Sequence, residues 1–150
     1  MSQWIKDQSD IADDGWIYRR IRLIPEHYVP IDPISGLPKI TNAALAYRDD
    51  GMSVAIGELM QHQQVEVSDL ADFARHAVAR CGVIDIRAAT AGVIASVDER
   101  DENEGRGRAH GLVRTDAPPP DRERWALVRD QIRRKMSLCD SPALEWVHTS

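Results

Sequence analysis

The sequence CGVIDIRAATAGVIASVDERDENEGRGRAHGLVR, residues 81–114, joins the longest apolar run of the chain to a charged loop and then to a short apolar segment. It contains two β-rich runs, 83–86 and 93–97, then an acidic loop over 98–104, and finally a third apolar run, 109–114. Small residues separate the first two runs, and glycines loosen the end of the acidic loop before the chain becomes apolar again. The stretch therefore predicts three short strands, with an exposed charged loop between the second and the third.

Residues 16–24, WIYRRIRLI, alternate between apolar and polar side chains, and this pattern predicts a strand with Ile17 and Ile21 on its apolar face. The same alternation places Arg19 on that face. Burial of an unpaired guanidinium is costly, so Arg19 needs a buried partner. A structural ion pair with Asp85 is the favoured interpretation, and a phosphate or carboxylate ligand held by the planar guanidinium is the alternative.

Residues 25–40 form a long loop, because four prolines and Gly36 prevent a regular helix or a central strand. A loop of this length in a small domain is more often functional or partner-binding than a neutral connector. The loop contains His27. The runs 44–48 and 52–56 then flank an Asp-Gly pair, which indicates a β-hairpin, and a helix that begins near residue 44 is the competing interpretation.

Two segments predict amphipathic helices. The first begins at Ser68, which can cap the N-terminus, and ends at Gly82. The second begins after Asp121, another capping residue, and carries basic residues in its last turn. The apolar faces comprise Leu70, Phe73, Ala74, Ala77 and Val78 in the first helix, and Trp125, Val128, Ile132 and Met136 in the second.

Short strands that do not alternate regularly with helices are typical of an α+β domain. We expect one globular domain over residues 1–150, with a mainly antiparallel sheet of short strands and the two amphipathic helices packed on one face. The acidic residues of 1–14 indicate a loosely held N-terminal arm. Three consecutive prolines within 116–120 indicate a semi-rigid spacer before the C-terminal helix.

The composition is that of a globular protein, with 43% hydrophobic and 29% charged residues. A net charge of −5 supplies no broad positive field, which argues against nucleic-acid binding. Cys81 and Cys139 have no metal-like spacing and are too few for a disulfide framework, so neither a metal nor another cofactor is expected. The first residues lack a signal-peptide pattern and no apolar run is long enough to cross a membrane, so we expect a cytoplasmic location and no membrane partner.

His110 is the first candidate catalytic residue. It begins the third predicted strand directly after the charged loop, where an acid–base residue can be held firmly and still reach solvent. His27, on the proline-rich loop, is the second candidate. Most histidines carry no catalytic role, so a surface or hydrogen-bonding role is favoured for both. The candidate ligand-binding residues are Arg19, Arg106 and Arg108.

The acidic residues of 98–104 do not have the spacing of a calcium-binding EF-hand, so a solvated charge run is favoured. Ser53 lacks the strand-to-helix elbow of a hydrolase nucleophile. In their order along the chain, Arg19, Ser53 and Glu102-Asn103-Glu104 are similar to the Arg, Ser and Glu-x-Glu of ADP-ribosyltransferases, a resemblance that implies a nucleotide substrate. The Glu pair, however, falls in a loop with no nucleotide-shaped framework around it, so the chain is not assigned to that family.

Four tryptophans among eight aromatic residues fall towards the two ends of the chain: Trp4, Trp16, Trp125 and Trp146. Tryptophan is favoured at contact surfaces. We therefore expect a small accessory or protein-interaction module whose partner is another protein or a second copy of the chain. The alternative is a small enzyme or ligand-binding domain for a phosphate-containing or nucleotide substrate, with Arg19 as the anion clamp and His27 or His110 as the acid–base residue.

Overall fold

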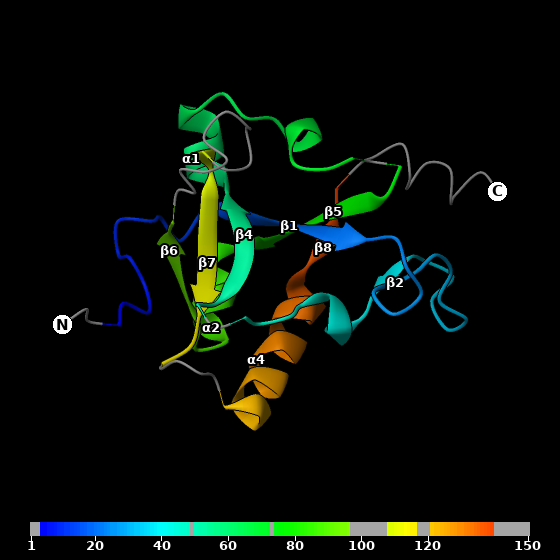
Figure 1. Ribbon diagram of the computed structural model, residues 1–150. Helices are drawn as coiled ribbons and strands as arrows, with labels where there is room; N and C mark the ends of the chain where they lie inside the picture. Colours follow the sequence, from blue (N-terminus) through cyan, green and yellow to red (C-terminus); the bar gives the residue numbers. More distant parts are fainter. Residues whose placement is uncertain (1–3, 49, 73, 97–107, 117–120, 140–150) are drawn as a thin grey trace.

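The computed structural model describes residues 4–48, 50–72, 74–96, 108–116 and 121–139. A six-stranded antiparallel sheet in the order β6-β7-β4-β1-β5-β8 forms the body of this part of the chain (Figure 1). Its strands are β1 (Trp16–Arg22), β4 (Met52–Ile56), β5 (His76–Gly82), β6 (Gly92–Ala95), β7 (His110–Arg114) and β8 (Ser137–Leu138). The helices of the described residues are α1 (Gly57–His62), α2 (Val83–Ala88) and α4 (Arg122–Lys135), with 3-10 turns η1 (Asn42–Ala44) and η2 (Val67–Asp69). The α+β fold class expected from the sequence is confirmed.

β1 lies inside the sheet, and its burial follows the predicted alternation, with Ile17 and Ile21 almost completely buried. It pairs with β5 along its whole length. It pairs with β4, on its other side, only at Ile17 and Tyr18. The pairing between β1 and β4 therefore ends just before Arg19.

Residues 76–82 form the strand β5, so the predicted helix from Ser68 to Gly82 is wrong. In the described part of that segment only the short turn η2 is helical. The apolar pattern is ambiguous because β5 is covered on both faces, and the successive residues Ala77, Val78 and Ala79 are all buried. A continuous apolar run fits a buried strand as well as a helix, and the pairing with β1 decides between them.

Residues 83–88 form the helix α2, where the sequence predicts a strand, and that prediction is also wrong. The first backbone N–H groups of α2 find their acceptors in the N-terminal arm: those of Val83 and Ile84 donate to the carbonyls of Gly15 and Asp13, at 2.9 and 3.1 Å. Asp85 consequently lies in the first turn of a helix.

α4 confirms the predicted C-terminal helix. Asp121 caps it, because its carboxylate accepts hydrogen bonds from two backbone N–H groups of the first turn at 2.8 and 3.2 Å. The indole Nε1–H of Trp125 donates to the carbonyl of Leu45 at 2.9 Å, which ties the buried face of the helix to the segment before β4. The buried residues of α4 are Trp125, Val128 and Ile132.

The helices pack against both faces of the sheet. α2 and α4 share one core with Ile17, Val54 and Ile56. α1 and η2 pack on the opposite face, around Ala55 and Val78. No helix in the described part of the chain is long and apolar enough to cross a membrane.

The proline-rich residues 25–40 contain two short strands, β2 (Tyr28–Val29) and β3 (Lys39–Ile40), which pair with each other outside the main sheet. This β2–β3 hairpin projects beyond the end of β1 (Figure 1). The predicted hairpin between 44–48 and 52–56 is wrong, since β4 pairs with β7 and β1, and the Asp-Gly region makes a single bridge between Arg48 and Gly51. The competing helix near residue 44 is wrong as well, because the turn η1 ends there.

Candidate functional site

Ser53 and His110 share a hydrogen bond between neighbouring strands. In the pairing of β4 with β7, Ala55 lies opposite His110 and Ser53 lies opposite Leu112. Because residues two apart on a strand face the same side, Ser53, Ala55 and His110 lie on one face of the sheet. The Oγ of Ser53 is 2.5 Å from the Nε2 of His110. Ser53 is exposed and His110 is half-buried, so solvent reaches this pair.

The second ring nitrogen of His110 fixes the direction of that hydrogen bond. The Nδ1 of His110 is 2.6 Å from the carbonyl oxygen of Ser96. A carbonyl oxygen only accepts hydrogen bonds, so Nδ1 carries the proton and donates it. In the neutral ring Nε2 is then the acceptor, and the hydroxyl of Ser53 donates to it. The three groups therefore form a chain in which a backbone carbonyl orients a histidine and the histidine accepts from a serine hydroxyl.

Arg19 contacts the backbone of the same serine. Its Nη1 donates to the carbonyl of Ser53 at 2.7 Å, and its Nε donates to the carbonyl of Ala44 at 3.0 Å. Where the pairing between β1 and β4 has ended, the guanidinium therefore replaces a backbone N–H as the donor to β4. Burial lowers the pKa of Arg19 to about 10, and the positive charges of Arg20 and Arg48 act in the same direction.

The predicted ion pair between Arg19 and Asp85 is wrong. Among the residues that the structure describes, no carboxylate lies within ion-pair distance of the Arg19 guanidinium. Two backbone carbonyls satisfy it instead, as charge-assisted acceptors. The inward register of Arg19 follows from the alternation of β1, whereas its partners depend on how β4 and η1 approach that strand.

The structure brings Arg19 and His110 to the same serine but leaves His27 apart from them. His27 is half-buried and directly precedes β2. Its backbone N–H donates to the carbonyl of Ile24, and its backbone carbonyl accepts from the N–H of Thr41. Figure 1 shows β2 on the opposite side of the molecule from β7. Arg108 is half-buried and lies two residues before the start of β7.

Three sequence-based candidates lie outside the described residues: the acidic loop 98–104, the Glu102–Glu104 pair within it, and Arg106. Among the residues that the structure does describe, no group of three His, Cys, Asp or Glu side chains could hold a metal ion.

Ser53 is the site residue that sequence reasoning discounted. The elbow motif of hydrolases was absent, but a serine can also face a histidine across two paired strands. The alternation of residues 52–56 and 110–114 shows which residues share a face within each run. The sequence does not show that these two runs, which are separated by more than fifty residues, are neighbours in the sheet.

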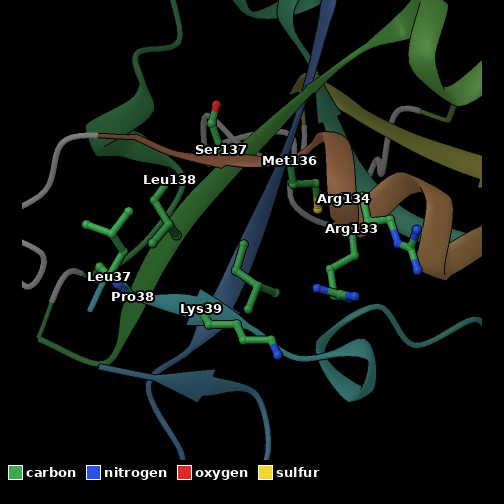
Figure 2. A pocket seen from close by; sticks show the side chains of 9 residues that line it. Leu37, Pro38, Lys39, Arg133, Arg134, Met136, Ser137 and Leu138 are labelled. Carbon is green, nitrogen blue, oxygen red and sulfur yellow. The ribbon is translucent and has the colours of Figure 1, made fainter. Parts of the chain in front are cut away.

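A groove of about 390 Å³ lies between the β2–β3 hairpin and the end of α4 (Figure 2). Leu37 and Leu138 line one side, and Arg133 and Arg134 line the other, with Lys39 between them. The remaining lining residues are Pro38, Ile40, Met136 and Ser137. The groove therefore combines apolar walls with a cationic side.

The cationic side of the groove keeps an excess of positive charge. Asp130 makes ion pairs with Arg133 and Arg134, each at 3.1 Å. The hydrogen bond from Arg133 lowers the pKa of Asp130, so this carboxylate stays charged. One carboxylate faces two guanidinium groups, and Lys39 adds a further positive charge at the groove. An anionic group would therefore be attracted to this side.

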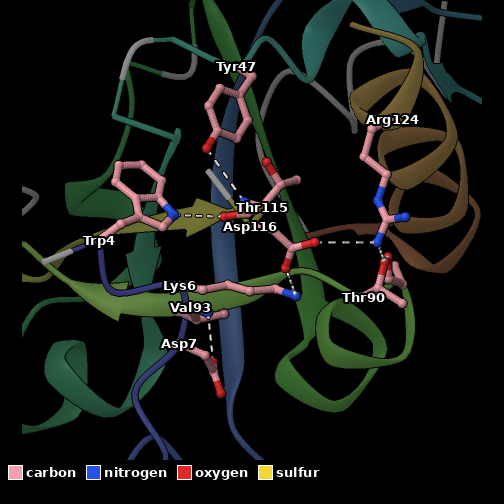
Figure 3. A network of polar contacts seen from close by, with 10 residues as sticks. Trp4, Lys6, Asp7, Tyr47, Thr90, Val93, Thr115, Asp116 and Arg124 are labelled. Atoms are coloured by element: carbon pink, nitrogen blue, oxygen red, sulfur yellow. Dashed lines mark hydrogen bonds and ion pairs between the residues drawn. The ribbon is translucent and has the colours of Figure 1, made fainter. Parts of the chain in front are cut away.

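A polar network ties the N-terminal arm to the body of the protein (Figure 3). Lys6 makes an ion pair with Asp116 at 2.7 Å, and this interaction lowers the pKa of the aspartate. Asp7 accepts a hydrogen bond from the N–H of Val93 at 2.9 Å, and the indole of Trp4 donates to the carbonyl of Thr115 at 2.9 Å. These contacts join residues 4–7 of the arm to β6 and to the residues that follow β7.

The tryptophans lie at separate places in the described structure. Trp125 is buried and meets the ring of Tyr47 edge-on, with centroids 4.8 Å apart. Trp4 and Trp16 each lie beneath an arginine guanidinium, that of Arg114 and that of Arg80. Trp146 lies outside the described residues. Trp4 and Trp125 therefore have intramolecular partners for their indole N–H groups. A contact with another protein is not needed to explain the position of either side chain.

Comparisons with protein-family models, with curated proteins and with solved structures find no match for this chain.

Proposed function

We propose that the protein is a cytoplasmic interaction module that binds an extended segment of another protein in the groove between the β2–β3 hairpin and α4. The observation that carries the proposal is the loop of that hairpin. Its residues Ile31, Ile34 and Leu37 are 61%, 96% and 59% exposed, respectively. Three large apolar side chains exposed on one short loop are typical of a binding site.

The hairpin loop is ordered before any partner arrives. The N–H of Asp32 donates to the carbonyl of Leu37 at 2.9 Å, and the N–H of Gly36 donates to the carbonyl of Asp32 at 2.8 Å. Ser35 adds a hydrogen bond to the Asp32 carboxylate, and Gly36 takes the positive φ of +72° that the turn requires. A loop already fixed in this way loses little conformational entropy on binding.

The groove beside the loop indicates what kind of segment would bind. Leu37, which belongs to both the loop and the groove, would contact apolar side chains of the partner. Lys39 and Arg134 would attract carboxylates. β8 is one of the two edge strands of the described sheet, so its backbone could pair with an extended chain. The partner segment is therefore expected to be extended and to mix apolar with acidic residues.

A second copy of the chain fits this surface less well than a different protein does. A symmetric contact between two copies places the same residues opposite each other. At this groove it would bring the two cationic sides together, and like charges across an interface oppose association. We therefore propose a different protein as the partner.

The experiment is a peptide display library selected against the purified protein. Selected peptides should mix Asp or Glu with large apolar residues, and the double variant Ile34→Ser/Leu37→Ser should not retain them. The matched control is Ile84→Ser/Leu127→Ser, which removes two exposed apolar side chains elsewhere, on α2 and α4, and should bind normally.

Two results would overturn the proposal. The first is a set of selected peptides that binds the loop variant and the control variant equally. The second is a dimer in light scattering that becomes monomeric in the loop variant, because the occupant of the groove would then be a second copy.

A further inference from the structure

We infer that Ser53 is a reactive nucleophile for activated acyl groups, with His110 as its general base. This inference goes beyond partner binding, and it rests on a different face of the protein. Its basis is the chain of contacts from the Ser96 carbonyl through the His110 ring to the Ser53 hydroxyl, at 2.6 and 2.5 Å. A nucleophile within hydrogen-bond reach of a base that a third group orients is the arrangement found in serine-based catalysis.

Three features of the structure suit Ser53 to this role. Its side chain is exposed, so a substrate can approach the hydroxyl. Its backbone is held by Arg19, whose guanidinium donates to the Ser53 carbonyl at 2.7 Å. Its hydroxyl lies within hydrogen-bond reach of Nε2 of His110, the ring nitrogen that must take the proton when the oxygen attacks.

The reaction expected with an ester begins with attack of the Ser53 oxygen on the carbonyl carbon. As the new C–O bond forms, the hydroxyl proton moves to Nε2 of His110. The ester C–O bond then breaks, and the departing alcohol takes that proton, which leaves an acyl group on Ser53. Water attacks the acyl carbon in turn and gives its proton to His110. The bond to Ser53 breaks, and the serine oxygen takes the proton back, so that the free acid leaves and the protein returns to its starting state.

A purely structural hydrogen bond between the two strands would leave Ser53 unreactive. The test is therefore reactivity at a named atom, measured with a fluorophosphonate probe. In that reaction an O–P bond forms at Ser53, the P–F bond breaks, fluoride leaves, and His110 takes the hydroxyl proton. Mass mapping of the intact wild-type chain should find the label on Ser53, and this readout needs no variant that must fold.

Variants then separate the roles of the two residues. Ser53→Ala should abolish labelling. His110→Gln keeps a polar side chain but removes the base, and it should slow labelling on the order of 100-fold. The matched controls are Ser68→Ala and His62→Gln, which change an exposed serine and an exposed histidine in the turn η2 and the helix α1. Both controls should be labelled at the wild-type rate.

A thiol at the same position gives a second measurement. In Ser53→Cys the new thiol should react with iodoacetamide faster when His110 is present than in the double variant Ser53→Cys/His110→Gln. Wild-type chain that stays unlabelled, label found on other serines, or equal rates with and without His110 would each overturn the inference.

Discussion

Replacement of Arg19 by Met measures how much stability depends on a guanidinium that bridges two backbone carbonyls. Met keeps most of the apolar stem and removes every donor. Ala44 is 2% exposed, so its carbonyl loses a partner without gaining water, at a cost of about 1–3 kcal/mol. Ser53 is exposed, so hydration of its carbonyl offsets much of the second loss. Met also removes the cost of burying a positive charge, which stabilises the variant. We expect a net loss of about 2 kcal/mol in the free energy of unfolding.

Denaturant titration and thermal melting would measure this loss. For a chain of this size a loss of about 2 kcal/mol corresponds to a fall in Tm of about 4–8 °C. The matched control is Arg22→Met, at an exposed position on the same strand, which should change stability by less than about 0.5 kcal/mol. An Arg19→Met variant as stable as the wild type, or more stable, would refute the reasoning that the two carbonyls depend on Arg19.

Four further predictions concern the core and the arm. Trp125→Phe leaves the buried carbonyl of Leu45 without its donor and should cost about 1–3 kcal/mol in denaturant titration, whereas a negligible loss would contradict that hydrogen bond. Gly92→Ala would place a Cβ atom 2.3 Å from the Lys6 carbonyl oxygen, so amides of the N-terminal arm should lose protection from hydrogen exchange, and unchanged protection would contradict the close approach. Burial raises the pKa of Cys81 to about 12, so mass mapping should find its thiol unreactive towards disulfide reagents at neutral pH until the protein unfolds. Stability should decline as the pH rises from 9.0 towards 12, because the thiol ionises first in the unfolded chain, and rapid labelling of the native thiol would contradict its burial.

Local sequence patterns correctly predicted an element where its own residues carry a clear signal for a strand or a helix. In β1, buried and more exposed side chains follow the alternation of apolar and polar residues in the sequence. In α4, the capping residue Asp121 marks the start of the helix. The patterns gave a wrong prediction where the secondary structure of a segment depends on the strands beside it. Ala77, Val78 and Ala79 are all buried because β5 is covered on both faces, so this apolar run fits a helix as readily as the strand that forms against β1.

The candidate site shows the same division. The sequence was enough to place Arg19 on an inward-facing position and His110 at the start of a strand. Neither the carbonyl partners of Arg19 nor the Ser53 partner of His110 could be deduced, because each contact depends on which strands lie side by side. Contacts between distant segments are set by the register of the whole sheet, and a single strand does not encode that register.

Binding at the hairpin groove is the central functional proposal, and amide chemical-shift mapping of the complex with a selected peptide tests it most directly. The account predicts that shift changes concentrate in residues 31–40 and 133–138, and that the Ile34→Ser/Leu37→Ser variant loses them. Changes confined to β6 and β7 or to α1, with the hairpin unaffected, would contradict it.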